Sequence, residues 1–198
     1  MEQLVRRTAQ RSPAFVIALG GFPGTGKTTV ARRLAAELGV PRLEADTLGR
    51  TIRASQALIK HTVDAQWIAY DVLFRLADEF LQTNASVILD INLGWPFQWQ
   101  QLDVLKQRHP TAPILPIMLR CSRDICLERI RGRYTANPAD HDPPEVFTTQ
   151  PSILGVWTFL EQLERPDMQF VDAANDHATM YAEVLQYVTQ QLNNHNPC

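Results

Sequence analysis

The stretch "ALGGFPGTGKTTVARRLAAELG" (residues 18–39) decides the fold, because it joins a strand to a helix through a glycine-rich loop. Residues 14–19 ("AFVIAL") form a continuous apolar run, which is typical of a strand buried on both faces. Over residues 27–38 apolar side chains recur at helical spacing, and Gly39 follows where a helix ends. The loop at 21–28 reads G-x-x-x-x-G-K-T and therefore predicts a phosphate-binding loop.

The chemistry of this loop explains the residue types in it. Glycines let the backbone curl so that successive N–H groups point at phosphate oxygens, and the helix dipole adds positive potential. Lys27 is expected to reach the β- and γ-phosphates of ATP, and the Thr28 hydroxyl to bind Mg²⁺. The expected nucleotide-binding residues are Gly21, Phe22, Pro23, Gly24, Thr25, Gly26, Lys27, Thr28 and Thr29.

The rest of the chain alternates strand and helix patterns. Short apolar runs predict strands at 41–46, 86–91, 112–119 and 168–173, and helical spacing predicts helices at 62–82, 97–109, 123–133 and 176–192. Such alternation requires parallel strands joined by right-handed crossovers. The expected fold class is α/β, a three-layer sandwich with a five-stranded parallel sheet. Pro116 predicts an irregular edge strand at 112–119.

Residues 134–151 interrupt this alternation, because they contain four prolines and little periodicity. Long segments of this kind in a compact domain are commonly functional, so we expect a mobile lid or loop insertion here. A chain of 198 residues is long enough for one core and short for two. We therefore expect a single domain over 1–198, with an N-terminal extension at 1–13.

Composition and charge exclude several classes of protein. The net charge of −2 argues against strong nucleic-acid binding, which needs dense Lys and Arg surfaces. Three cysteines (Cys121, Cys126 and Cys198) without a C-x-x-C pair argue against a disulfide framework and a zinc knuckle. The apolar run at 14–19 is too short for a membrane span and runs into the glycine loop. We expect no signal peptide, no membrane anchor and a cytoplasmic location.

Other motifs narrow the kind of phosphate-loop protein. The chain has no guanine-reading N-K-x-D and no L-S-G-G-Q signature, which leaves the small phosphoryl transferases. It resembles the P-loop kinase group that includes zeta toxins, chloramphenicol phosphotransferase, shikimate and gluconate kinases and polynucleotide kinases. The resemblance is carried by "GFPGTGKTTVARRLAAELG", "LEADTLGR", "VILDINLGW" and "CSRDICLERIRGR". It implies a P-loop NTPase fold like that of nucleoside monophosphate kinases.

The resemblance assigns an acceptor side to "LEADTLGR". In these kinases an Asp at the end of the second strand faces the acceptor hydroxyl, and Asp46 matches it. Glu44 lies two residues earlier, so both carboxylates would project from one face of a strand. Arg50 and Arg53 follow where they could hold an anionic acceptor. Alternatively, Asp46 caps the next helix and the arginines are ordinary surface residues.

Asp90 ends the apolar run "VILD" in a Walker-B-like arrangement. A carboxylate at the carboxyl end of a central parallel strand lies in the crevice where ligands bind, so Asp90 is a candidate for supporting Mg²⁺ through a water. The alternative is an Asp that caps the following turn. Asn92, just beyond, is a candidate for the acceptor site.

Arg129 and Arg133 are expected at the base of the lid. In the resembled kinases, including adenylate kinase, arginines there touch adenine and the transferring phosphate. Their spacing of four puts them on one helix face, where they could neutralise charge on the γ-phosphoryl oxygens. The alternative is a solvated basic helix end.

Two further features are weaker signals. Trp95, Phe97 and Trp99 either wall an acceptor pocket or pack in the core. The five histidines lack metal-ligand spacing, and His141, between two aspartates in the lid segment, is the one of interest.

These observations predict an ATP- and Mg²⁺-dependent phosphotransferase that moves the γ-phosphate to a hydroxyl of a small-molecule acceptor. Its expected catalytic residues are Lys27, Asp46, Arg129 and Arg133. Two alternatives stay open: a polynucleotide 5′-hydroxyl kinase, and a regulatory module that binds ATP without transferring phosphate. The sequence does not indicate an oligomeric state.

Overall fold

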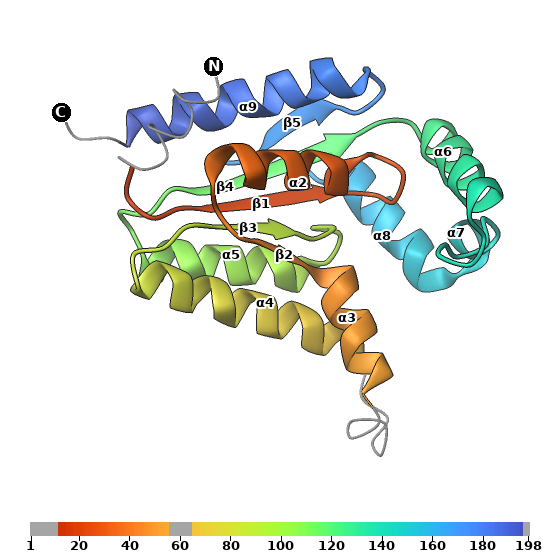
Figure 1. Ribbon diagram of the computed structural model, residues 1–198, viewed down its shortest axis with the longest axis horizontal. Helices are drawn as coiled ribbons and strands as arrows, with labels where there is room; N and C mark the ends of the chain where they lie inside the picture. The colour runs from red at the N-terminus through yellow and green to blue at the C-terminus, as the bar shows by residue number, and fades with distance from the viewer. Residues whose placement is uncertain (1–11, 56–64, 196–198) are drawn as a thin grey trace.

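The protein is built on a five-stranded parallel sheet, and the computed structural model describes residues 12–55 and 65–195. The strands lie in the order β2-β3-β1-β4-β5, and every pairing between neighbours is parallel (Figure 1). Their bounds are β1 Val16–Gly21, β2 Arg42–Glu44, β3 Val87–Asp90, β4 Ile114–Arg120 and β5 Gln169–Asp172. The expected five-stranded parallel sheet is therefore confirmed.

Helices connect the strands and cover both faces of the sheet, as parallel strands require. They are α2 Lys27–Leu38, α3 Ala45–Ala54, α4 Ala65–Gln82, α5 Pro96–Arg108, α6 Arg123–Ala136, α7 Val146–Thr149, α8 Pro151–Gln162 and α9 His177–Asn194. The helix expected at 62–82 is described from Ala65 on, and its first residues lie outside the described part of the chain.

The central strand β1 contributes side chains to two hydrophobic cores, one on each face of the sheet, because successive side chains of a strand point to opposite faces. Ile17 and Leu19 pack with α2 and α9, whereas Val16 and Ala18 pack with α4, α5 and α8. All six residues of β1 are buried. This two-sided burial is the physical basis of the three-layer sandwich.

The strand β4 corrects one expectation. It lies inside the sheet, between β1 and β5, and not at an edge. The N–H of Val16 donates to the carbonyl of Pro113, and donors alternate along a strand, so the missing N–H of Pro116 faces the β5 side. Pairing with β5 begins only at Ile117, one residue later. Pro116 therefore deprives no paired strand of a donor.

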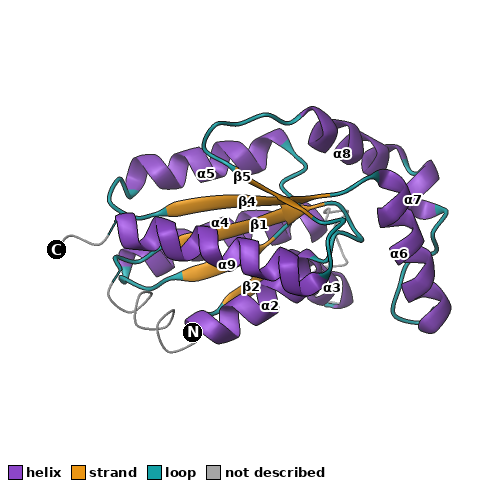
Figure 2. Ribbon diagram, turned by 90° about the horizontal axis from the view of Figure 1, so that it is seen from above, coloured by secondary structure: helices purple, strands orange, loops and turns teal. Residues whose placement is uncertain are grey.

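The segment at 134–151, expected as a lid or loop insertion, contains short helical stretches on either side of a nonhelical run at 137–145. α6 continues to Ala136, α7 occupies Val146–Thr149 and α8 begins at Pro151. These helices lie at the end of the molecule toward which the strands point (Figures 1 and 2). α8, which the sequence did not predict, packs Trp157 edge-on against the Phe22 ring, with centroids 4.5 Å apart.

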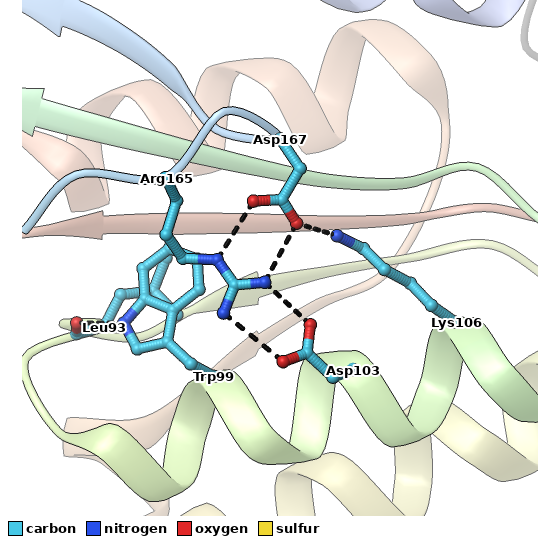
Figure 3. A network of polar contacts seen from close by, with 6 residues as sticks. All are labelled: Leu93, Trp99, Asp103, Lys106, Arg165 and Asp167. Carbon is cyan, nitrogen blue, oxygen red and sulfur yellow. Dashed lines mark hydrogen bonds and ion pairs between the residues drawn. The ribbon is translucent and has the colours of Figure 1, made fainter.

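A polar network ties α5 to the segment before β5 (Figure 3). The Arg165 guanidinium donates to Asp103 Oδ1 at 2.8 Å and to Asp167 Oδ1 at 2.9 Å, and it lies over the Trp99 ring. Lys106 also pairs with Asp167, and the Trp99 indole N–H donates to the carbonyl of Leu93. We call Trp99, Asp103, Lys106, Arg165 and Asp167 the Arg165 network.

Within the described ranges 12–55 and 65–195, no helix combines the length and apolarity that a membrane span needs.

Candidate phosphate-transfer site

The loop between β1 and α2 has the backbone shape that the motif predicts. Gly24 and Gly26 adopt φ angles of 96° and 88°, a region that side chains disfavour. A Cβ at Gly24 would lie 2.6 Å from the carbonyl oxygen of Cys126, and one at Gly26 would lie 2.9 Å from Cε1 of His177. The glycines are thus required both by the curl of the loop and by the close packing of α6 and α9 against it.

Two side chains hold the loop from inside. The Thr25 hydroxyl is buried and donates to the carbonyl of Phe22 at 2.8 Å. The Phe22 ring is buried between Phe147 and Trp157. Both residues were expected to bind nucleotide. In the structure their side chains are buried and hold the shape of the loop. Only their backbone atoms remain candidates for contacting phosphate.

A cavity of about 600 Å³ opens over the loop. It brings together most of the predicted site, although those residues come from four separate parts of the chain. The predicted residues that line it are Pro23, Gly24, Gly26, Lys27, Thr28, Thr29, Asp46, Arg50, Arg53, Asn92 and Arg133. The predicted residues that lie outside its lining are Gly21, Phe22, Thr25, Glu44, Asp90 and Arg129.

Glu44 and Asp46 do not form the pair of carboxylates on one strand face that the sequence predicts. β2 ends at Glu44 and α3 begins at Ala45, so Asp46 lies in the first turn of a helix and not on the strand. Glu44 accepts hydrogen bonds from Arg42 and Thr47, and those partners, opposed by burial, lower its pKa. Asp46 alone lines the cavity. One carboxylate, not two, faces the position expected for an acceptor.

Arg129 and Arg133 lie on the same helix but have different surroundings. Arg129 Nη1 donates to the carbonyls of Ala173 at 2.7 Å and of Gly24 at 3.3 Å, so it holds the phosphate loop against the end of β5. Arg133 lines the cavity and has no carboxylate partner among the described residues. Crowding by protein atoms lowers its pKa, although the residue stays partly open to solvent.

Asp90 is buried beneath the loop at the end of β3. Its Oδ2 accepts a hydrogen bond from Arg42 at 2.7 Å, and burial raises its pKa against the opposing effects of Lys27, Thr28 and Arg42. Oδ1 is buried and accepts no hydrogen bond of normal geometry from the described residues. A buried carboxylate oxygen beside a threonine hydroxyl is an oxygen donor set that suits Mg²⁺. The residues therefore fit the ion that a phosphate loop implies.

Asn92 lines the cavity and also shapes the chain around it. Its carbonyl accepts the N–H of Gly21, and its Oδ1 accepts the N–H of Gly94 at 3.0 Å. These bonds tie the segment after β3 to the start of the phosphate loop. Asn92 is therefore both a cavity residue and a structural one.

The cavity also contains residues that sequence reasoning missed or left open. Gln66, Trp67 and Tyr70 on α4 line it, and so does Trp95 after β3. Of the three aromatics at 95–99, Trp95 faces the cavity, Phe97 packs against Trp67 and Tyr70, and Trp99 is buried. Helical spacing identified the α4 aromatics as apolar. Their proximity to the loop depends on how α4 packs, which periodicity cannot show.

The far wall of the cavity comes from the segment after α6 and from α7 and α8. Its lining residues are Ile130, Asp140, His141, Asp142, Phe147, Gln150, Ser152, Ile153 and Val156. His141, which the sequence singled out, thus faces the cavity. Part of the segment that the sequence predicts as a lid or loop insertion therefore lines the cavity.

Comparisons with known proteins identify the family of this chain. A family model described as an AAA domain matches residues 16–150. The adenylate kinase of Mycobacterium leprae (strain Br4923) is 30% identical over 132 residues, which cover 63% of this chain and 73% of that protein. The adenylate kinase of Mycobacterium ulcerans (strain Agy99) is 33% identical over 135 residues, with the same coverage of each chain.

Solved structures share the fold. A gluconokinase from Sinorhizobium meliloti 1021 has a TM-score of 0.55 and 23% identity, covering 92% of this chain and 93% of its own. Kti12 from Chaetomium thermophilum, in complex with ADP-AlF3, has a TM-score of 0.60 and 18% identity, covering 89% and 98%. The narrower resemblance to zeta toxins and chloramphenicol phosphotransferase stays a prediction. The chain belongs to the AAA domain family and, within it, to the P-loop kinases.

Proposed function

We propose that this protein is an ATP- and Mg²⁺-dependent phosphotransferase that moves the γ-phosphoryl group to a hydroxyl of a small molecule. One observation carries the proposal. A single cavity is lined on one side by the phosphate loop with Lys27 and on the other by Asp46 with Arg50 and Arg53. A site that only holds a nucleotide has no use for an additional carboxylate and two additional guanidiniums from α3 in the same cavity.

The nucleotide side follows from the loop. Its N–H groups and the N-terminus of α2 would hold the β- and γ-phosphates, and the Lys27 ammonium would neutralise them. Thr28 and, through a water, Asp90 would hold Mg²⁺. When bound, the ion would draw charge from the phosphate oxygens as the bond to the leaving group breaks.

The acceptor side would be served by Asp46. It would accept the proton of the attacking hydroxyl, which leaves late in a loose transition state, so a carboxylate can serve as the base. Arg133 would stabilise charge on the transferring group from the opposite wall. Arg129 would act indirectly, because it donates to the carbonyl of Gly24 and so holds the shape of the phosphate loop.

The wall formed by α7 and α8 would exclude water. Water competes with the acceptor for an activated phosphoryl group, so kinases of this chemistry need a closed site. Mobility of this wall, expected from the prolines at 134–151, remains part of the proposal.

A second candidate acceptor is the phosphate group of a nucleoside monophosphate. The observation that favours it is the likeness to adenylate kinases, together with Arg50 and Arg53 in the cavity. This reaction would need no general base, because a phosphate oxygen is already ionised. Dependence on Asp46 therefore separates the two chemistries.

The test is a screen of metabolite pools for stimulated ADP release, followed by mass spectrometry of the phosphorylated product. Transfer to an alcohol that disappears in both Lys27→Ala and Asp46→Asn supports the proposal, provided that Asp46→Asn still binds ATP. Conversion of AMP to ADP that tolerates Asp46→Asn would favour the second candidate. Salt-sensitive transfer to single-stranded oligonucleotides would favour a polynucleotide kinase, and release that no pool stimulates would favour a regulatory module.

A further inference from the structure

The acceptor half of the cavity has an aromatic wall. Trp67 and Tyr70 come from the first turns of α4, and Trp95 comes from the segment after β3. The Trp67 ring lies 5.2 Å from that of Trp95 and 4.8 Å from that of Phe97, measured between centroids. Phe97 also contacts Tyr70 at 5.7 Å. Phe97 therefore packs against two of the rings that line the cavity, Trp67 and Tyr70.

Trp67 stands out because it is large, apolar and 43% exposed. Burying such a side chain is favourable, and neighbouring positions on α4, such as Leu73 and Phe74, are buried in the core. The exposed face of Trp67 is open toward the cavity that it lines. A ring held at a fixed angle beside a cavity is a platform for another flat group.

The arginines of α3 supply positive charge to the same half of the cavity. Arg50 donates to the Thr47 hydroxyl, and neither Arg50 nor Arg53 is paired with a carboxylate among the described residues. Spacings of four and seven from Asp46 put both guanidiniums on the helix face of that carboxylate. At a rise of 1.5 Å per residue, the Cα atoms of Arg50 and Arg53 lie about 6 and about 10 Å from that of Asp46 along the helix axis.

We propose that the acceptor is a small alcohol that carries a planar ring and an acidic group, and this inference rests on the proposed function. The hydroxyl lies at Asp46, the ring stacks on Trp67 beside Tyr70 and Trp95, and the acid pairs with Arg50 and Arg53. The distance along α3 fits one ring between the two polar ends. Stacking on tilted aromatic rings selects a flat group over a flexible chain, and guanidiniums bind carboxylate or phosphate in a two-pronged geometry.

The test compares three probes that differ by one feature each. They are para-hydroxymethylbenzoate, benzyl alcohol, which lacks the acid, and ω-hydroxyhexanoate, which lacks the ring. Calorimetry on the full chain with ADP and Mg²⁺ present measures their dissociation constants without requiring transfer. We expect the first probe to bind about tenfold tighter than either of the others.

Two variants test whether Trp67 and Arg53 cause the preference for the probe that has both the ring and the acid. Trp67→Leu is expected to abolish the advantage over ω-hydroxyhexanoate, and Arg53→Gln the advantage over benzyl alcohol. Leu76→Ala and Arg75→Gln, exposed positions on α4 that do not line the cavity, are the matched controls and should leave both ratios unchanged. Unchanged binding of ADP and Mg²⁺ in every variant confirms an intact fold.

The outcomes separate this inference from the proposed function. Equal affinities for the three probes, or ratios that neither variant changes, would overturn the acceptor class even if the metabolite screen finds an alcohol. A ring-and-acid preference that depends on Trp67 and Arg53 supports the acceptor class. Transfer to the phosphate of AMP in the screen would overturn the proposed function, and with it the inference that the acceptor is an alcohol, whatever the three probes show.

Discussion

The arginines of the cavity and the arginine of the Arg165 network are surrounded in opposite ways. Arg165 donates to two carboxylates and lies over an indole ring (Figure 3). Arg50, Arg53 and Arg133 face a cavity, and none of them pairs with a carboxylate in the described part of the chain. Ion pairs within the protein, such as those of Arg165, hold the paired side chains in one position. Unpaired charges around a hollow create a potential that attracts an anionic ligand.

The carboxylates repeat the contrast. The guanidinium of Arg165 holds the pKa of Asp167 well below its usual range, so this ion pair favours the ionised form of Asp167. Burial raises the pKa of Asp90 in spite of the opposing effects of Lys27, Thr28 and Arg42. The ion pairs of the Arg165 network therefore favour the ionised form of Asp167, whereas the surroundings of Asp90 disfavour its ionised form.

The largest effect is expected at Arg133. Arg133→Gln should lower the rate of phosphoryl transfer about 10²- to 10³-fold, because it removes the charge that we propose stabilises the transferring group. Its free energy of unfolding should change by less than about 0.5 kcal/mol, since no ion pair is lost. Rates and urea titrations measure the two quantities. Arg131→Gln, on the same helix but outside the cavity lining, is the control, and a full rate for Arg133→Gln would contradict the contrast.

The next effect is expected at Arg42. Arg42→Gln should lower the free energy of unfolding by about 3 kcal/mol, because it leaves the buried Asp90 carboxylate without its partner. ATP with Mg²⁺ should recover part of this loss by supplying another cation near Asp90. Urea titrations with and without the nucleotide measure it. A loss below about 0.5 kcal/mol would mean that Arg42 contributes little to stabilising the buried Asp90 carboxylate.

A smaller effect is expected at Arg165. Arg165→Gln should lower the free energy of unfolding by about 1 to 2 kcal/mol, because its partners are partly exposed and water screens the pairs. The transfer rate should not change. The pKa of Asp167 is lower in the folded chain than the ordinary 3.8, so its stabilisation is present above that value and is lost as the pH falls below it.

The pH dependence gives the check on this prediction. The gap in stability between wild type and Arg165→Gln should be constant from pH 7 to pH 5 and shrink as the pH falls below about 4. Denaturation at each pH measures it. A gap that persists in acid would indicate that packing over Trp99, rather than charge, carries the contribution of Arg165.

The smallest effect is expected at Arg75, whose pair with Asp71 is exposed on α4. Arg75→Gln should change the free energy of unfolding by no more than about 0.5 kcal/mol, as is usual for such pairs. The same titrations measure it. A larger loss would mean that solvent exposure does not rank the ion pairs of this protein.

The sequence alone determined the layout of the fold. A buried run before a glycine loop, a helix after it and regular alternation thereafter are local patterns, and they led to the parallel sheet, the phosphate loop and some of the residues that line the cavity over it. Ser122, which accepts the N–H of Ile125, caps α6 as its residue type predicts. These features follow from neighbours in the chain, so a linear pattern carries them.

Only the tertiary structure decided which groups face one another. Asp46 and Glu44 separate because a helix begins at Ala45, and Arg129 turns to backbone carbonyls while Arg133 faces the cavity. Trp67 meets Trp95 because α4 packs beside the end of β3, although 28 positions separate them in the chain. Spacing along the sequence fixes the face of an element on which a side chain lies. The neighbour that it meets depends on packing between distant elements, which local patterns do not encode.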